Sequence, residues 1–399
     1  MVKPQTLKGF RDFLPSEARK RQFVINTLKQ VSESYGFEPL ETPALEYEEI
    51  LLGKYGEEGD KLMYRFVDRG NRKVAMRYDQ TVPLARVVTQ YQNDLPMPFK
   101  RYQIQNVWRA DNTQKGRFRE FLQCDADIVG SNSPLSDSET ILVATKSLEK
   151  LGFRNFTVLI NSREILKKSG ASPNFLRTLD KQDKLSKDEF LKLLAEAKEY
   201  DKKAYEFLKN SKPEDDSALN EIFKNKNLNL FYLPTLARGL DYYTGVIFEV
   251  KIDGYSAGSV CGGGRYDNLI GLFAKKQIPA VGFAFGFDRL IEAMEELKLF
   301  PADLISTKVL VTIFSKELLE KSIGISSRLR SNNINTELYL DENSSLEKQL
   351  KYADKKGIPY VVIIGPDEAS KNMLTFRNMQ TAEQTLLSEE DAIAKIKKS

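Results

Sequence analysis

The sequence has 399 residues, 41% of them hydrophobic and 29% charged, which is the composition of a globular chain with two or three domains. Its 60 basic and 56 acidic residues leave a formal net charge of +4, so nucleic-acid binding must come from local patches rather than from an overall basic character. The chain has two cysteines and no histidine, which excludes a disulfide framework, a zinc cluster and any mechanism with a histidine base.

Periodic and alternating patterns predict the first elements of the chain. A helix is expected over 16–35, with Ser16 as its cap and an apolar stripe toward a core. Paired strands are expected over 64–68 and 73–77, around the turn 69–71. Further helices are expected over 46–52, 81–91 and 138–151, and a strand over 156–160.

The most informative stretch is a hairpin with arms over 99–110 and 117–128 and a polar loop over 111–116. Both arms alternate, so one face of each arm points toward a core and the other carries polar and charged side chains. Residues 100–119 hold six basic side chains and one acidic side chain. Guanidinium groups bind phosphates well, so the polar face is either an anion site or an ordinary solvated sheet face.

In the middle of the chain, the composition and the predicted secondary structure change twice. From 163 to 230 the chain is rich in Lys, Glu and Asp with helical signals, which predicts a small helical insertion. A strand is then expected over 236–252, with Tyr242 and Tyr243 on opposite sides, as packing residues or as a polar pocket wall. The stretch 256–265 contains three consecutive glycines, which allow another backbone or a ligand to come close.

A strand over 280–287 and a helix over 288–299 follow. Arg289 lies in the first turn of this helix, where the dipole disfavours a cation, so we expect it either in solvent or beside a bound anion. After a linker over 301–307, strands and helices alternate, which predicts an α/β domain with a mixed or parallel sheet. The strands are expected over 308–314, 336–340, 360–364, 374–377 and 385–387, and the helices over 316–331, 346–356 and from 389 onward.

These stretches together resemble the histidyl-tRNA synthetase family of class II aminoacyl-tRNA synthetases. The hairpin NVWRADNTQKGRFREF resembles class II motif 2, and 280–290 with Arg289 resembles motif 3. The segment 37–45 with Pro43 resembles motif 1, the dimer-forming element. ARGLDYYTGVIFE at 237–249 resembles the histidine-specific signature, and MRYDQTVPLAR at 76–86 and CGGGRYDNL at 261–269 are also similar to family members.

The resemblance covers essentially the whole chain and implies an α+β fold. That fold has a class II antiparallel sheet core with helices, a small helical insertion and a C-terminal α/β anticodon-binding domain. The implied division is a catalytic core over 1–162 and 233–302, the insertion over 163–232 and the anticodon-binding domain over 306–399. The implied activity joins ATP and L-histidine into histidyl-adenylate and transfers the histidyl group to the 3' end of tRNA-His. ATP would arrive with Mg²⁺, no side chain is assigned to a metal, and the protein would be a homodimer in the cytoplasm with no membrane span.

The resemblance also implies residue roles. Arg109, Arg238 and Arg289 would be catalytic, with Arg109 and Arg238 on the α-phosphate. The ATP site would comprise Arg109, Asp111, Arg117, Arg119, Phe121 and Arg289, with Phe121 on adenine and either Arg117 or Arg119 on the terminal phosphates. The histidine site would comprise Asp79, Thr81, Arg109, Gln123, Asp127, Arg238, Tyr242, Tyr243 and Tyr266.

Within the histidine site, the substrate's ammonium group would meet Asp79, Thr81 and Gln123. Its imidazole would lie between Asp127 and Tyr243. The tRNA end would meet Asn112, Gln114 and Lys115.

The sequence leaves alternatives open. The chain could be a catalytically inactive, synthetase-like regulatory subunit, a tRNA-sensing module, or a class II synthetase for another amino acid. Arg238 and the C-terminal domain argue against the inactive subunit, and RGLDYY argues against another amino acid. The absence of histidine would let such an enzyme be made during histidine starvation, or it reflects engineering.

Overall fold

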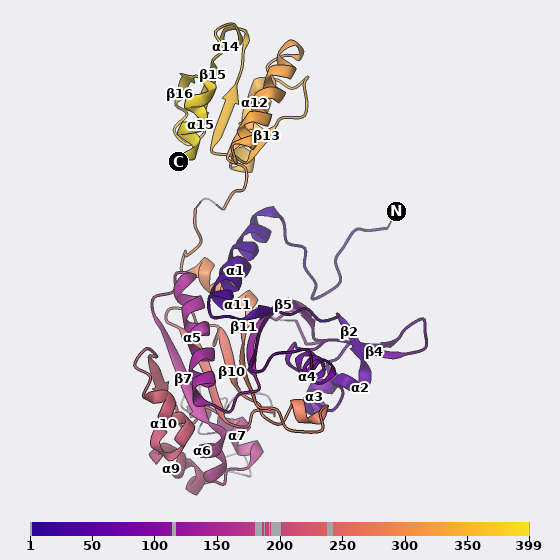
Figure 1. Ribbon diagram of the computed structural model, residues 1–399, viewed down its shortest axis with the longest axis vertical. Coiled ribbons are helices and arrows are strands. Elements are labelled where there is room, and N and C mark those ends of the chain that lie inside the picture. The colour runs from indigo at the N-terminus through magenta and orange to yellow at the C-terminus, as the bar shows by residue number, and fades with distance from the viewer. Residues whose placement is uncertain are drawn as a thin grey trace. The chain divides into compact units, whose positions relative to one another are not determined.

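The predicted hairpin lies inside a large mixed sheet in the N-terminal part of the chain (Figure 1). Its arms are β5 (Phe99–Trp108) and β6 (Glu120–Val129), which pair antiparallel along their whole length. The other strands of this large sheet are β1 (Glu38–Pro39), β7 (Phe156–Ser162), β8 (Leu230–Tyr232), β9 (Val246–Ile252), β10 (Cys261–Arg265) and β11 (Ala280–Gly286). Their order is β1-β5-β6-β11-β10-β9-β7-β8, antiparallel except at the edges, where β1 runs parallel to β5 and β8 to β7.

The computed structural model describes residues 2–113, 117–179, 186, 188–190, 192, 201–237, 242–302 and 304–398. The chain forms two compact units, Met1–Phe300 and Pro301–Ser399, and the boundary falls at the start of the predicted linker. Within the described ranges, we find no helix with the length and apolarity needed to cross a bilayer.

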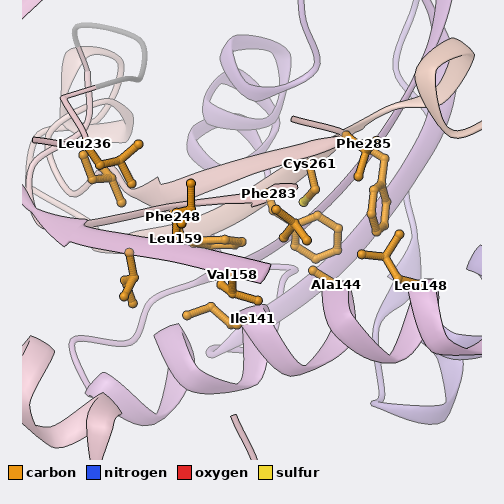
Figure 2. Packing of buried hydrophobic residues seen from close by; sticks show 14 of the residues in the cluster. Ile141, Ala144, Leu148, Val158, Leu159, Leu236, Phe248, Cys261, Phe283 and Phe285 are labelled. Atoms are coloured by element: carbon orange, nitrogen blue, oxygen red, sulfur yellow. The ribbon is translucent and has the colours of Figure 1, made fainter. Parts of the chain in front are cut away.

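Two long helices, α1 (Pro15–Ser34) and α5 (Pro134–Lys150), pack against the apolar face of the large sheet. Figure 2 shows Ile141 and Leu148 of α5 beside Val158, Phe283 and other sheet residues. The even-numbered residues of β6 from Cys124 to Ile128 belong to the same core, which confirms the predicted alternation. The opposite face of β5 and β6 is therefore left for polar side chains.

Shorter helices complete the N-terminal unit. They are α2 (Glu48–Leu51), α3 (Gly56–Lys61), α4 (Thr81–Gln90), α6 (Arg163–Lys168), α7 (Pro173–Leu179), α9 (Lys202–Asn210), η2 (Pro213–Asp215), α10 (Ser217–Phe223), η3 (Ile270–Leu272) and α11 (Phe287–Glu296). The described part of the stretch 163–230 is mostly helical, as predicted.

Four predictions of element bounds were wrong. The helix predicted over 46–52 begins only at Glu48, because Glu46 and Tyr47 belong to a strand over 45–47. Helix α1 begins at Pro15, and Leu14 precedes it without a side-chain cap, so Ser16 is not the cap. Helix α5 begins four residues before the predicted start at 138, because Ser133 accepts the Leu135 N–H as its cap and Pro134 suits the first turn. The predicted strand over 236–252 is reduced to β9, since Leu236 lies in a turn that it closes with Leu233.

A small sheet of β2 (Leu45–Tyr47), β4 (Lys73–Met76) and β3 (Arg65–Val67) lies in the same unit. Its β3–β4 turn contains Asn71 in the left-handed region, at φ 58°, which asparagine tolerates well. Paired residues share a face of a sheet, so the row Tyr47, Val74, Phe66 lies on one side.

The C-terminal unit is the predicted alternation of strands and helices. Its strands are β12 (Val309–Val311), β13 (Thr336–Leu338), β14 (Tyr360–Ile363), β15 (Leu374–Asn378) and β16 (Gln384–Leu387). Its helices are η4 (Lys316–Leu318), α12 (Leu319–Ser331), α13 (Leu346–Lys356), α14 (Pro366–Ser370) and α15 (Glu389–Lys397). The sheet order β13-β12-β14-β15-β16 is parallel around β12 and antiparallel beyond β14, so the sheet is mixed. The sequence did not predict α14.

A buried ion pair joins α5 to β10. The Arg265 Nε lies 3.1 Å from Asp137 Oδ1, and Arg265 Nη1 also donates to the carbonyl of Ser131 at 2.9 Å and to Asp267 at 3.2 Å. The Asp137 side chain is only 2% exposed, so this carboxylate neutralises a guanidinium that water hardly reaches.

Asp137→Ala should lower the free energy of unfolding of the N-terminal unit by about 3 kcal/mol, because the Arg265 charge stays buried with only Asp267 beside it. Denaturant unfolding followed by the fluorescence of Trp108, the chain's one tryptophan, reports on this unit. Glu149→Ala is the control: its partner Lys146 is exposed on the same helix, and the expected change is below about 0.5 kcal/mol. Equal effects of the two variants would contradict the prediction.

Candidate active site

A cavity of about 580 Å³ opens over the polar face of the large sheet, within the size range of small-molecule sites. Its floor comes from β6, β10 and β11, and its walls from the segment before α4, the start of α11 and the β5–β6 loop. Twelve of the predicted site residues line it: Asp79, Thr81, Arg109, Asp111, Arg117, Phe121, Gln123, Asp127, Tyr242, Tyr243, Tyr266 and Arg289.

Other predicted site residues lie elsewhere. Arg119 is not in the lining; its Nε donates to the carbonyl of Asp111 at 3.2 Å, and its side chain packs on Gly9. Asn112 is exposed on the loop and also lies outside the lining. Arg238, Gln114 and Lys115 lie outside the described residues.

Asp127 is a buried carboxylate of the floor. Its Oδ2 lies 2.7 Å from Nη2 of Arg101, a fully buried side chain of β5, and its Oδ1 accepts the hydroxyl of Tyr266. Burial raises the pKa of Asp127, against the opposing charge of Arg101. The carboxylate fits only because its β11 neighbour is Gly282: a Cβ there would lie 1.9 Å from Asp127 Oδ1.

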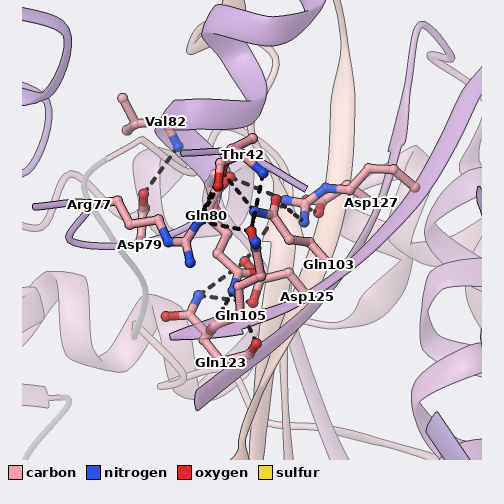
Figure 3. Close-up of polar contacts among 12 residues, drawn as sticks. Thr42, Arg77, Asp79, Gln80, Val82, Gln103, Gln105, Gln123, Asp125 and Asp127 are labelled. Carbon is pink, nitrogen blue, oxygen red and sulfur yellow. Dashed lines mark hydrogen bonds and ion pairs between the residues drawn. The ribbon is translucent and has the colours of Figure 1, made fainter. Parts of the chain in front are cut away.

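Asp79 presents a carboxylate oxygen that has no partner in the described part of the chain (Figure 3). Its Oδ1 accepts the Tyr55 hydroxyl at 2.8 Å and the Val82 N–H at 3.1 Å, in the first turn of α4. Its Oδ2 is buried and accepts nothing there, and burial raises the pKa of the carboxyl. A buried, unpaired carboxylate oxygen in a cavity suits a cationic group of a ligand.

Arg109 connects the floor of the cavity to its mouth. Its Nε donates to the carbonyl of Tyr78 at 3.0 Å and its Nη2 to Gln123 Oε1 at 3.4 Å. The guanidinium carbon lies 4.5 Å from the ring centre of Tyr78 and 5.1 Å from that of Phe121. This packing fixes the Arg109 guanidinium between the carboxylates of the floor and the arginines near the mouth.

At the mouth, Arg289 lies in the first turn of α11 and donates to the carbonyl of Ser259 at 2.8 Å. Its neighbour Asp288 is held by Arg11 at 2.8 Å and Arg21 at 2.9 Å. Arg11 also stacks on Phe118, 3.2 Å from the ring centre. The N-terminal segment thus ties the hairpin loop to α11.

The two tyrosines that alternation placed on opposite sides both face the cavity. Tyr242 and Tyr243 lie outside a strand, with ring centres 5.1 Å apart, and Tyr242 also meets Tyr266 at 5.7 Å. The prediction of a strand here was wrong, so period-two alternation does not apply. Both tyrosines line the cavity and also pack against the apolar core, so each of the two interpretations describes part of their surroundings.

Sequence reasoning missed three contributors to this site. Arg101 and Asp125 stand on the polar face of the hairpin but received no role, and Tyr55 lies far from the recognised motifs. The alternation of β5 and β6 was the signal available for Arg101 and Asp125, since it puts both on the face of Asp127.

Comparison with known proteins gives consistent matches over both units. A sequence model described as "Histidyl-tRNA synthetase" matches residues 9–212 and 163–290, and one described as "Anticodon binding domain" matches 308–399. A histidine–tRNA ligase of Cytophaga hutchinsonii is 38% identical, covering 99% of this chain and 100% of that protein. One of Wolinella succinogenes is 40% identical, covering 96% of each chain. The crystal structure of histidyl-tRNA synthetase from Nostoc superposes with a TM-score of 0.85 at 30% identity, covering 100% of both chains.

The buried carboxyl of Asp125 makes the free energy of unfolding depend on pH. Burial raises its pKa to about 8, against the charge of Arg101. Between about pH 4 and pH 8, the folded chain therefore keeps a proton that the unfolded chain has lost. Because the folded state binds more protons, this group lowers stability as pH rises through that window and adds no further change above it.

Asp125→Asn should remove this slope, which for one proton is at most about 1.4 kcal/mol per pH unit. Denaturant unfolding at several pH values from 5 to 9, followed by Trp108 fluorescence, measures it. Asp94→Asn, at an exposed position, should keep the wild-type slope. An unchanged slope in Asp125→Asn would mean that Asp125 is already ionised in the folded chain.

Proposed function

The chain belongs to the histidyl-tRNA synthetase family and is a histidine–tRNA ligase, and on this premise we propose how its residues divide the binding of histidine and ATP. One observation supports the division: a single cavity has carboxylates on its floor and arginines toward its mouth. Opposite charges are thus separated along one hairpin, which suits an amino acid at one end and a triphosphate at the other.

Histidine lies on the floor. Its imidazole meets Asp127 and the Tyr243 hydroxyl, a carboxylate and a hydroxyl that together satisfy both ring nitrogens. An amino acid without these nitrogens would leave buried polar groups unpaired, which gives strong discrimination. The substrate's ammonium group takes the unpaired oxygen of Asp79, with Thr81 and Gln123 beside it.

ATP lies toward the mouth. Arg109 holds the α-phosphate next to the histidine carboxylate, and Phe121 stacks on adenine with Asp111 near its amino group. For the terminal phosphates we assign Arg117 and Arg289, since both line the cavity and Arg119 does not. Arg238, outside the described residues, keeps the implied role of a second cation on the α-phosphate.

Mg²⁺ enters as part of the ATP substrate. In the described ranges, no group of three or more Cys, Asp and Glu side chains could hold a metal, and the chain has no histidine. Phosphate oxygens are hard ligands of the kind that Mg²⁺ prefers, so the triphosphate itself would hold the ion.

The first step needs positioning and charge neutralisation rather than a base. A carboxylate oxygen of histidine, already ionised, attacks the α-phosphorus of ATP, and the bond from that phosphorus to the β-phosphate oxygen breaks to release pyrophosphate. Charge builds on the α-phosphoryl oxygens, where Arg109 stabilises it. No proton has to be removed, so a chain without histidine loses nothing in this step.

In the second step a hydroxyl of the tRNA's terminal ribose attacks the histidyl carbonyl carbon, the bond from that carbon to the phosphate oxygen breaks, and AMP leaves with the hydroxyl proton on one of its phosphate oxygens. Asn112 is exposed on the hairpin loop that borders the mouth, and we assign it to the tRNA end with Gln114 and Lys115, which lie outside the described residues. The C-terminal unit, matched by the anticodon-binding model, would hold the other end of tRNA-His.

ATP–pyrophosphate exchange with each amino acid in turn tests this function, and only histidine should support exchange. Asp79→Asn should raise the KM for histidine by at least about tenfold, because the ammonium loses a carboxylate partner, and should leave the KM for ATP within about twofold. Asp94→Asn, exposed and remote from the cavity lining, is the control. Exchange with another amino acid, or equal changes in both KM values, would count against the assignment.

We also propose that two copies of the chain pair through the small sheet. Tyr47 and Phe66 are 52% and 47% exposed on the same face, and Leu45, two residues before Tyr47 in β2, lies on that face and is 42% exposed. A cluster of large apolar side chains in solvent is typical of a covered surface. The sheet follows directly on 37–45, the stretch that resembles the dimer-forming motif.

The double variant Tyr47→Arg/Phe66→Arg should be monomeric in light scattering, because two buried guanidinium groups per copy would face each other. Leu386→Arg, at a 48% exposed position of the C-terminal unit, should leave the wild-type mass unchanged. A monomeric wild type, or a double variant that stays dimeric, would contradict the proposal.

A further inference from the structure

Asp125 is a buried carboxylate of the cavity floor that the proposed division of labour does not use. It lies between Gln123 and Asp127 on the same face of β6, and the residue is only 4% exposed. Its two oxygens lie 2.9 and 3.0 Å from a single donor, Nε2 of Gln123. The contact is drawn in Figure 3.

Asp125 is not needed to neutralise a cation in the floor. The nearest cation is Arg101, whose Nη2 lies 3.9 Å from Asp125 but 2.7 Å from Asp127. Asp127 is thus the closer partner of that guanidinium. A second carboxylate so deeply buried is costly, and a neutral side chain of the same size would pack the strand at lower cost.

The contact with Gln123 decides which end of its amide faces the cavity. Both oxygens of Asp125 lie within 3.0 Å of Gln123 Nε2. Above about pH 8, where Asp125 is ionised, this carboxylate only accepts hydrogen bonds, so it selects the NH₂ end of the amide and leaves Oε1 at the other end. That oxygen points toward Arg109, whose Nη2 lies 3.4 Å away. With the amide reversed, its NH₂ group would face this arginine and any ammonium group beside it.

We propose that Asp125 is a positioning residue for the substrate's ammonium group, because it holds the Gln123 amide with Oε1 toward the substrate. This rests on the proposed role of Gln123 in histidine binding. Asp125 itself does not touch the substrate; it acts through Gln123 alone. Its removal therefore affects ligands that carry the ammonium group and spares ligands that lack it.

The test compares two ligands of the full-length enzyme by calorimetry at pH 8.5, where most of Asp125 is ionised: histidine and 3-(imidazol-4-yl)propionate, which is histidine without the amino group. Asp125→Asn should weaken histidine binding by about tenfold, since asparagine can donate as well as accept and no longer fixes the amide. Binding of imidazolylpropionate should change by less than about twofold. In exchange assays the loss should appear in the KM for histidine and not in the KM for ATP.

The double variant Gln123→Glu/Asp125→Asn provides the rescue. A glutamate presents an oxygen to the ammonium in either orientation, while the asparagine amide introduced two residues along the strand donates to the other glutamate oxygen. Histidine binding should return to within about threefold of wild type. A double variant no better than Asp125→Asn would overturn the proposal, as would equal weakening of both ligands or unchanged histidine binding in Asp125→Asn.

Gln123→Leu separates this inference from the function on which it rests. If Gln123→Leu leaves histidine binding unchanged, the assignment of Gln123 to the ammonium is wrong, and the role of Asp125 is wrong with it. If Gln123→Leu weakens histidine binding but Asp125→Asn does not, the assignment of Gln123 stands and only the role of Asp125 is wrong.

Discussion

The guanidinium of Arg101 is the buried charge around which the floor of the cavity is arranged. Its side chain is fully buried within the large sheet, 2.7 Å from Asp127, and it also donates to Gln103 and to the carbonyl of Gln80. A cation in such a place is costly unless carboxylates neutralise it, and it in turn opposes the rise in their pKa values. The substrate pocket therefore depends on a charge balance inside the sheet as much as on its shape.

Charged side chains continue along the hairpin beyond Arg101. The inner ends of β5 and β6 carry Arg101 with its two aspartates, and the outer end carries Arg109 against Phe121. A ligand with an ammonium at one end and phosphates at the other matches this order. Because the attacking carboxylate is already ionised and the stabilising groups are permanent cations, the chemistry of activation fits a chain that contains no histidine.

Much of this arrangement could be predicted from the sequence, because alternation in β6 fixes which residues share a face. It placed Gln123 and Asp127 together and assigned Cys124, Ala126 and Ile128 to the core. Alternation shows which face a side chain lies on but not which side chains of that face bind a ligand. For this reason Asp125 and Arg101 received no role from the sequence.

Other features depend on the path of the backbone and were not predictable from local pattern. Tyr242 and Tyr243 both reach the cavity because they lie in a turn-rich segment and not in a strand. Arg117 and Arg119 are two residues apart, and Arg119 is kept out of the lining by its hydrogen bond to the Asp111 carbonyl and its packing against Gly9. Contacts with segments that are remote in the sequence determine which of these side chains reach the cavity. A single sequence does not reveal such contacts.

The close approach of Gly282 to Asp127 limits how this pocket can be redesigned for an amino acid with a larger side chain. At Gly282 there is no side chain to remove, and even a Cβ there would lie 1.9 Å from the carboxylate. Tyr266 is tied to Asp127 through its hydroxyl, so trimming it would disturb the floor. Tyr242 and Tyr243 are two large rings of the lining whose trimming would open space for a bulkier ring, and directed evolution of altered amino acid specificity can begin with libraries at these two positions.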